Sequence, residues 1–336
     1  MVLAEVIRSG FAESRHRGSV VVLGPDDRAV LGAGETTAAA FPRSANKPMQ
    51  AVGMLSAGLD LEGKLLALAA ASHSGEAFHV AGVREILAGA GLDETALRCP
   101  PALPLDEQAL RQVLREGGDA DRVHMNCSGK HAAMLAACAA AHWPTGSYLD
   151  PDHPLQRQIR RTVEHLSGEP VAAVGVDGCG APLFALSLTG LARAFRTMVL
   201  AEPGSAPRRV ADAMRAYPDW TSGTHRPESA LMEAVPGLLL KSGAEGVMAF
   251  ALPGGHAAAI KIEDGAARAL PAVTVALLRS LGVGAAGGAD DTALDRIASV
   301  PVLGGGRAVG HIQPVLPTAP EPARDREARG SSRCGW

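Results

Sequence analysis

The stretch GLLLKSGAEGVMAFALPGGHAAAIKIEDG, residues 237–265, decides the fold class of this chain. It contains three apolar runs, Leu238–Lys241, Gly246–Leu252 and His256–Ile262, separated by short turns of Gly, Pro and acidic residues. Runs of this length between such turns are typical of consecutive strands in a sheet. We predict strands over these runs and over Ala267–Leu270, followed by helices over 271–281 and 291–300.

Strands are also predicted near the start of the chain. Ser19–Leu23 and Ala29–Leu31 flank the turn Gly24-Pro25-Asp26-Asp27, a pattern typical of a hairpin. Between the two strand regions, apolar residues recur at helical spacing. The predicted helices of this middle region are 48–57, 64–71, 80–90, 109–116, 131–141, 153–166, 182–200 and 207–216.

This order of elements predicts an α/β or α+β fold, with a sheet assembled from the N- and C-terminal segments. We expect one domain over residues 1–316, in which a helical subdomain at about residues 76–235 is inserted into the sheet domain. The remaining segment, 317–336, mixes Pro, charged residues, Ser and Gly, and we predict a disordered tail there.

The composition excludes several classes of protein. The 336 residues carry 32 basic and 35 acidic side chains, a formal net charge of −3, so a nucleic-acid binder is not expected. The chain starts without a signal-peptide pattern, and no apolar run approaches a membrane span. Five cysteines without a C-x-x-C pair favour a reduced, cytoplasmic setting and disfavour a finger-type zinc site.

Lysine is rare among the basic residues. The chain has 27 Arg but only five Lys, which are Lys47, Lys64, Lys130, Lys241 and Lys261. A buried Lys amine can lose its proton, whereas an Arg guanidinium cannot. The lysines are therefore the first candidates for chemistry that Arg cannot perform.

Ser44-Ala45-Asn46-Lys47 is an S-x-x-K motif. A Ser and a Lys three residues apart can lie on one face of a helix or turn, where a neutral Lys amine can take the Ser proton. The alternative is a solvated turn before a helix that begins at Pro48, since proline disfavours helical geometry in the residue before it.

Two further segments could supply a second Ser–Lys pair. Ala71–Glu76 (ASHSGE) offers Ser72 as another nucleophile or substrate contact, although its serines could simply cap the adjacent helices. Lys241 lies at the end of a predicted strand, in a turn that contains Gly243. Its alternative role is that of a charged turn residue between strands.

Two loops carry a cysteine directly before a predicted helix, NCSGKH at 126–131 and DGCGAP at 177–182. Together they could bring Cys127, Lys130 and Cys179 into a three-ligand metal site, although Lys is an unusual ligand and must be deprotonated to serve. The alternative is that Cys127 is an inert buried residue and Lys130 a surface charge.

Seven segments, taken in order, resemble the asparaginase II family of the Rhizobium etli type. They are RSANKP (43–48), ASHSGE (71–76), NCSGKHAAML (126–135), DPDHPLQ (150–156), VDGCGAP (176–182), LLLKSGAEG (238–246) and KIEDG (261–265). The resemblance runs from about residue 13 to about residue 310. It implies a fold similar to those of serine β-lactamases and penicillin-binding proteins.

The resemblance also implies hydrolysis of L-asparagine to L-aspartate and ammonia through two Ser–Lys tandems. Ser44 would be the nucleophile and Lys47 its base, while Ser72 and Lys241 would relay protons or orient Ser44. An acyl-enzyme would form on the nucleophile and would then be cleaved by water.

A supporting zinc ion and a homodimer are implied by the same resemblance. The zinc ligands would be Cys127, Lys130 and Cys179, and the ion would help to place the substrate. The expected substrate contacts beside these motifs are Arg43, His131 and Asp177. The stretch between the Cys179 loop and Lys241 is shorter than in the family, which puts the surface that caps the substrate in question.

Two alternatives compete with this interpretation. The S-x-x-K motif is also compatible with a β-lactamase-like or peptidase-like serine acylase. The two cysteine loops are compatible with a non-catalytic protein that binds zinc or an amino acid. Release of ammonia from asparagine separates both alternatives from the asparaginase hypothesis.

Overall fold

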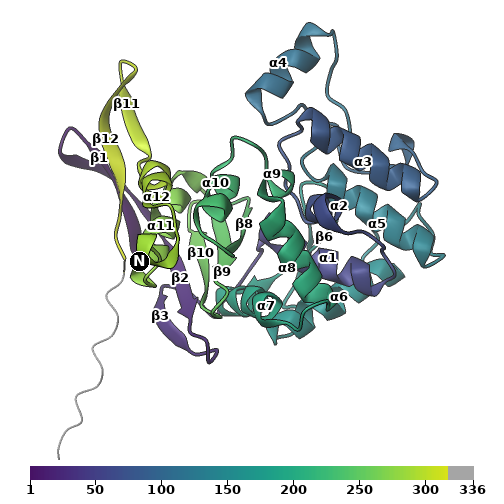
Figure 1. Cartoon of the computed structure of the whole chain (residues 1–336), viewed down its shortest axis with the longest axis horizontal. Helices are drawn as coiled ribbons and strands as arrows, with labels where there is room; N and C mark the ends of the chain where they lie inside the picture. Colours follow the sequence, from purple (N-terminus) through teal and green to yellow (C-terminus); the bar gives the residue numbers. More distant parts are fainter. Residues whose placement is uncertain (317–336) are drawn as a thin grey trace, which may run out of the picture.

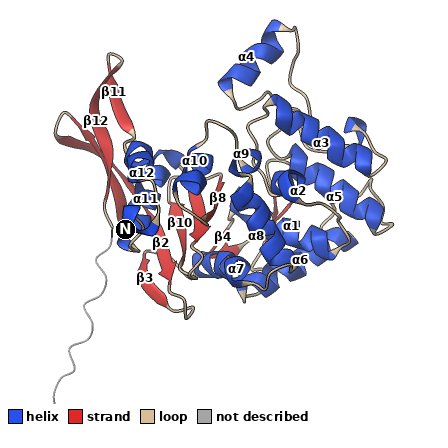
Figure 2. Ribbon diagram, in the orientation of Figure 1, coloured by secondary structure: helices blue, strands red, loops and turns tan. Residues whose placement is uncertain are grey.

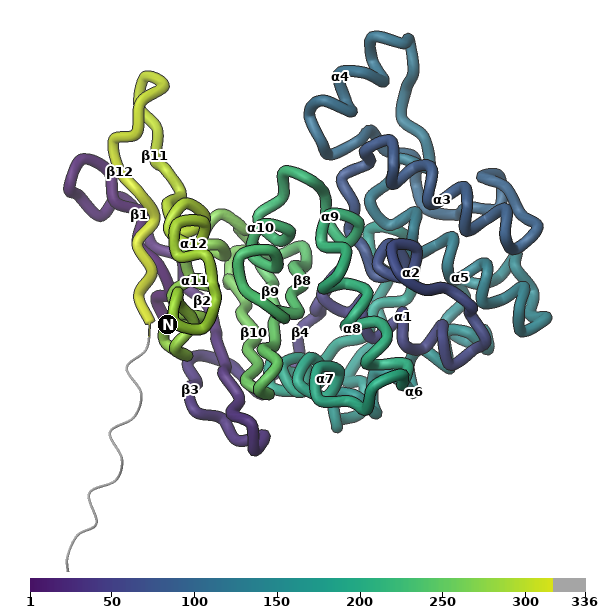
Figure 3. Tube along the Cα trace, viewed as in Figure 1, coloured from purple at the N-terminus to yellow at the C-terminus, as the bar shows by residue number. Residues whose placement is uncertain are grey.

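The computed structural model describes residues 1–316, so the predicted tail at 317–336 lies outside the described residues. Its main sheet has eight antiparallel strands in the order β11-β12-β1-β2-β10-β9-β8, and β3 also pairs with β2. The strands are β1 (Val2–Arg8), β2 (Phe11–Leu23), β3 (Ala29–Ala33), β8 (Leu239–Gly243), β9 (Val247–Ala251), β10 (Ala257–Ile262), β11 (Pro301–Gly304) and β12 (Arg307–Pro314). Figure 3 shows the two ends of the chain side by side in this sheet, which confirms the predicted pairing of N- and C-terminal segments.

Helices cover both faces of the sheet (Figure 1). Successive residues of β2 alternate between two cores, because side chains along a strand point to opposite faces: Val20 and Val22 belong to one, Val21 and Leu23 to the other. The first core includes α10 (Pro227–Ala234), α11 (Leu270–Ser280) and α12 (Asp291–Ala298). The second includes α7 (Leu188–Leu200), which contacts β2, β9 and β10. The mixed α/β class predicted from the sequence is confirmed.

The remaining helices form a body beside the sheet (Figure 2). They are α1 (Lys47–Ser56), α2 (Gly63–Ala69), α3 (Ala77–Gly89), α4 (Glu107–Arg115), α5 (Ser128–Ala140), α6 (Pro154–Ser167), α8 (Ala206–Ala216) and α9 (Pro218–Thr221). Both α1 and α2 pack within this body although they precede residue 76, where the predicted helical subdomain begins.

The smaller elements are four 3₁₀ helices and two two-stranded sheets. The 3₁₀ helices are η1 (Arg43–Asn46), η2 (Glu94–Ala96), η3 (Ala267–Ala269) and η4 (Ala285–Gly287). One small sheet joins β4 (Ala39–Ala40) to β7 (Leu186–Ser187), and the other joins β5 (Val174–Val176) to β6 (Pro182–Phe184). Within residues 1–316, no helix has the length and apolar character needed to cross a membrane.

Two predicted elements are wrong. Ala267–Leu270 is not a strand but the 3₁₀ turn η3 leading into α11, where Pro271 occupies the first turn that proline favours. The helix predicted over 182–200 begins only at Leu188, because Ser187 caps it by accepting a hydrogen bond from Gly190 N, and the residues before it form β6 and β7. Strands β1, β11 and β12 were not predicted.

Candidate active site

Strand β8 carries residues of the candidate site on both of its faces. Leu239 packs in the core shared with the helical body and Leu240 in the opposite core, so side chains alternate along the strand. Lys241 accordingly reaches the helical body, where its Nζ donates to Ser72 Oγ. Ser242 faces α10, where its Oγ donates to Glu228 Oε1.

Ser72 lies between two lysines. Its Oγ accepts hydrogen bonds from Lys47 Nζ at 2.9 Å and from Lys241 Nζ at 3.0 Å. Lys47 Nζ also donates to Ala71 O at 2.6 Å, and Lys241 Nζ donates to Ser242 O at 2.8 Å. A hydroxyl oxygen has two lone pairs, and on Ser72 both accept a hydrogen bond from a lysine. The Ser72 hydrogen is therefore free to point away from the lysines.

The electrostatics of Lys241 favour loss of its proton. Lys241 is 2% exposed. Burial lowers the pKa of Lys241 to about 7, a protonated Lys47 adds to this effect, and the Glu228 carboxylate opposes it. An amine with a pKa in this range can exchange a proton near neutral pH.

Ser44 lies in η1, directly before α1. The Lys47 backbone N–H donates to Ser44 O, but in the described part of the chain no hydrogen bond joins the two side chains; the Lys47 amine contacts Ser72 instead. Gly243 of β8 packs against the Ser44 turn, since a Cβ added there would lie 2.3 Å from Pro42 O and 3.3 Å from Ser44 N. Only glycine allows this close approach of two backbones.

The two serines open into one cleft of about 880 Å³. Its polar end is lined by Ser44, Ser72 and Asn126, and its other end by apolar residues of α11 and α12. Arg226, Glu228 and Ser242 complete the wall on the α10 side. A cleft that combines apolar walls with a few convergent polar groups is the usual form of a small-molecule site.

The two cysteine loops meet beside this cleft. Cys127, Asp177 and Cys179 place their possible ligand atoms within 4.8 Å of one another. Lys130 Nζ donates to Cys179 Sγ at 3.1 Å. A hydrogen bond from Cys179, and the Lys47 and Lys130 charges, hold the pKa of the Cys127 thiol well below its usual value despite burial. Two thiols and an amine in this arrangement fit the preference of zinc for sulfur and nitrogen ligands.

The three expected substrate contacts take different positions. Arg43 Nε donates to Asp177 Oδ1 at 2.7 Å, so these two residues pair with each other. His131 is buried, and its Nδ1 is 2.7 Å from the Tyr148 hydroxyl. That hydroxyl also accepts from Arg98 N, and the other ring nitrogen of His131, Nε2, has no hydrogen-bond partner among the described residues.

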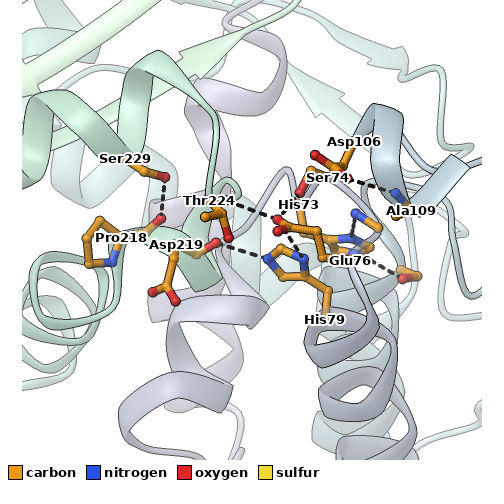
Figure 4. A network of polar contacts seen from close by, with 12 residues as sticks. His73, Ser74, Glu76, His79, Asp106, Ala109, Pro218, Asp219, Thr224 and Ser229 are labelled. Carbon is orange, nitrogen blue, oxygen red and sulfur yellow. Dashed lines mark hydrogen bonds and ion pairs between the residues drawn. The ribbon is translucent and has the colours of Figure 1, made fainter. Parts of the chain in front are cut away.

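A polar network fixes the loop that borders the cleft (Figure 4). Glu76 Oε2 accepts from Ser74 Oγ at 2.6 Å and from the Thr224 backbone at 3.0 Å, which joins the Ser72–Glu76 segment to the loop before α10. Gly223 allows this approach: its φ is +154°, and an added Cβ would lie 2.2 Å from Ser74 Oγ. The network therefore sets the position of the next residues, His225 and Arg226, on the cleft wall.

Sequence reasoning missed Asn126 as a residue of the cleft, and it missed Arg226 and Glu228 entirely. Arg226 is one of 27 arginines, and Glu228 follows a proline at the start of a short helix, so neither forms a recognisable motif. The one available signal was the density of charge in Arg226-Pro227-Glu228 after a glycine-bearing turn. Asn126 was quoted within NCSGKH but given no role.

Comparison with known proteins identifies the family of this chain. Residues 4–314 match the L-asparaginase II family, which is nearly the whole of the described chain. The chain therefore belongs to the L-asparaginase II family. A sequence comparison with curated proteins gave no match.

Solved structures with a similar arrangement were also found. One is Mglu in its native form in the presence of 4.3 M NaCl, with 16% identity and a TM-score of 0.44 over 83% of this chain and 65% of that chain. This chain thus spans less than two thirds of the Mglu chain. A β-lactamase from Mycobacterium bovis has 17% identity and a TM-score of 0.44, over 79% of this chain and 95% of that chain. EstCE1, a hydrolase with promiscuous acyltransferase activity, has 12% identity and a TM-score of 0.39, over 73% of this chain and 88% of that chain.

Proposed function

We propose that this protein is an L-asparaginase that hydrolyses the side-chain amide of L-asparagine to L-aspartate and ammonia through Ser–Lys catalysis. The observation that carries the proposal is the position of Ser72 Oγ between the Lys47 and Lys241 amines, on the wall of a cleft that also holds Ser44. Family membership supports the amide as the bond that is cleaved.

In the first half of the proposed reaction, Ser44 Oγ attacks the amide carbon and Lys47 takes the hydroxyl proton. Ser44 suits this role because its hydroxyl has no bond to either lysine, whereas the oxygen of Ser72 accepts from both. The Ser72 hydrogen is donated to the amide nitrogen as the carbon–nitrogen bond breaks and ammonia leaves. Lys47, which holds the proton taken from Ser44, then returns a proton to Ser72, whose oxygen it contacts.

In the second half, water attacks the ester formed on Ser44. The water gives one proton to the neutral Lys241 amine, the bond between the acyl carbon and Ser44 Oγ breaks, and that oxygen recovers the proton from Lys241 through Ser72. The sum of both halves is one amide and one water converted to one carboxylic acid and one ammonia, which become carboxylate and ammonium when the acid transfers its proton. The lysines end in the protonation states in which they began.

Zinc has a supporting role in this proposal. Cys127, Lys130 and Cys179 would hold the ion, with Asp177 as a further oxygen donor within the same cluster. When bound, zinc would supply a positive charge that orients the substrate beside the serines. The buried Nε2 of His131 adds one more polar atom beside Lys130, on the next position of α5.

The test is ammonia release by the wild-type chain and by Ser44→Ala, with L-asparagine and L-glutamine, with and without added zinc. We expect wild-type activity on asparagine and a loss of about 10⁴-fold or more in the variant. Full activity of Ser44→Ala together with an inactive Ser72→Ala would assign the nucleophile to Ser72. Hydrolysis of a chromogenic β-lactam without asparagine turnover would favour a serine acylase, and stoichiometric zinc without any hydrolysis would favour a binding protein.

Two further parts of the proposal concern the state of the protein in the cell. We propose a homodimer, which light scattering of the purified chain tests directly. We also propose a cytoplasmic location, on the basis of the sparse cysteines, and fractionation of the source cells tests it.

A further inference from the structure

A charged pair on the cleft wall has no part in the proton transfers described above. Arg226 directly precedes α10, and Glu228 lies in the first turn of that helix. Both line the cleft that holds Ser44 and Ser72. Arg226 also borders the neighbouring cavity beside α4, so its side chain lies where the two cavities meet.

The guanidinium of Arg226 makes no hydrogen bond within the described residues. Its Nε is buried and has no hydrogen-bond partner there. Its ion-pair partner, Glu228 Oε2, lies 3.5 Å away without a hydrogen bond between them. Glu228 in turn accepts from Ser242 Oγ at 2.5 Å and lies beside Lys241. A guanidinium has five N–H donors in a planar fork, so Arg226 can bind another carboxylate.

The other arginines are less suited to this role. Arg43, which the family resemblance selects, donates to Asp177 and does not line the cleft. Arg268 donates to His16 Nε2 at 2.9 Å, which ties it to β2. Arg296 is exposed and lies at the apolar end of the cleft, next to Ile297.

Arg226 is also held close to the reacting groups. Glu228 connects it to Ser242, and Ser242 O accepts from the Lys241 amine that contacts Ser72. The Thr224–Glu76 hydrogen bond fixes the loop on the other side of Arg226. Because the backbone on both sides of Arg226 is held in place, its side chain can orient a ligand without a large loss of conformational freedom.

We propose that Arg226 binds the α-carboxylate of the substrate, so that the cleft selects amides with a free carboxylate. This inference rests on the proposed amidase function. The bidentate ion pair between a guanidinium and a carboxylate would fix one end of the substrate, and the amide at its other end would then face Ser44 and Ser72.

The test compares three amides that differ in one group: L-asparagine, succinamic acid, which lacks the α-amino group, and β-alaninamide, which lacks the α-carboxylate. In the wild type, we expect β-alaninamide to have a KM about 10- to 100-fold above that of asparagine. Arg226→Gln should raise the KM of asparagine and succinamic acid by the same factor and leave that of β-alaninamide unchanged. Arg226→Lys should restore part of the loss.

Arg296→Gln is the matched control, because it removes an arginine from the far end of the same cleft. We expect it to leave the KM of each amide unchanged. An equal rise in KM for all three amides in Arg226→Gln, or no rise for any, would overturn the inference while the proposed function stands. The ratio of KM values within one variant is independent of the fraction of protein that is folded.

A binding measurement separates this inference from the proposed activity. Calorimetric titration with L-aspartate should show binding to the wild type that Arg226→Gln weakens about 10- to 100-fold. If no amide is hydrolysed but aspartate binding depends on Arg226, the proposed function fails and the carboxylate site stands. Aspartate binding that Arg226→Gln leaves unchanged overturns the carboxylate site.

Discussion

Two buried lysines in neighbouring parts of the site have opposite electrostatics. Lys241 and Lys130 are each 2% exposed. A protonated Lys47 adds to the effect of burial on Lys241, whose pKa falls to about 7. Burial also lowers the pKa of Lys130, but the Cys179 and Cys127 thiols and the Asp177 carboxylate outweigh it and raise that pKa above its ordinary value. Both lysines are buried, so the charges of their neighbours decide the difference in pKa. Lys241 is suited to proton transfer, and Lys130 is suited to pair with thiolates.

The largest expected effect is on the proton-transfer side of this comparison. Lys241→Arg keeps a positive charge but cannot lose its proton, so we expect kcat to fall about 10²- to 10⁴-fold. Ammonia release from asparagine measures it. Lys261→Arg is the control, because the Lys261 amine, within residues 1–316, bonds to backbone oxygens outside the cleft. Equal activity of Lys241→Arg and the wild type would remove Lys241 from the proton path.

The next effect tests the metal side. Lys130→Met removes the amine from the cysteine cluster, and we expect zinc affinity to fall by at least about tenfold. Competition with a chromogenic chelator measures it without any activity assay. Lys64→Met is the control, since Lys64 is an exposed lysine that lies over the Trp220 ring. Unchanged zinc affinity in Lys130→Met would exclude Lys130 as a ligand.

A third prediction concerns pH and connects Lys241 to Glu228. In the second half of the proposed reaction a neutral Lys241 amine accepts a proton from water, so kcat should rise with pH through about 7. The Glu228 carboxylate raises the pKa of Lys241. Glu228→Gln removes that charge, so the pKa of Lys241 falls and the acid limb of the profile moves to lower pH. A shift to higher pH, or the same shift in the exposed control Glu233→Gln, would contradict this account.

The smallest effect tests the contact that holds the Ser44 turn against β8. Gly243→Ala places a methyl group 2.3 Å from Pro42 O, and we expect a loss of about 1–3 kcal/mol in the free energy of unfolding. Urea denaturation measures it. Gly254→Ala is the matched control, because no atom lies within 4 Å of the added Cβ. Similar losses in both variants would mean that the close approach at Gly243 has no special cost.

Most of the sheet could be predicted from local patterns, and the exceptions have physical reasons. The apolar runs of β8, β9 and β10 end in Gly or Pro turns, and those patterns were sufficient. Strand β12 (RAVGHIQP) has no clear alternation and only one fully buried residue, Ile312, so its pairing with β1 could not be predicted from the pattern. The strand wrongly predicted over Ala267–Leu270 has a similar cause, because four residues are too few to show whether apolar residues recur at strand or helix spacing.

The structure brings the motif residues together, but with only one of the two predicted side-chain contacts. The family resemblance paired Ser44 with Lys47 and Ser72 with Lys241, and of these pairs the structure shows the second. The structure places Lys47 and Lys241 on the same oxygen, that of Ser72. Asp177 was expected to contact substrate, and it lies between Arg43 and Cys179. The pairing of side chains depends on packing between elements, which spacing along the chain does not encode.

The sequence by itself determined the alternation of the central strands, the mixed α/β class and the blocks that place the chain in its family, because each of these is a local pattern. Only the tertiary structure decided that Ser72 meets one lysine 25 positions before it and another 169 positions after it. It also decided which arginine faces the cleft and which buried lysine tends to lose its proton. These properties depend on distances between charges and on removal of water, and both arise only when distant segments pack together.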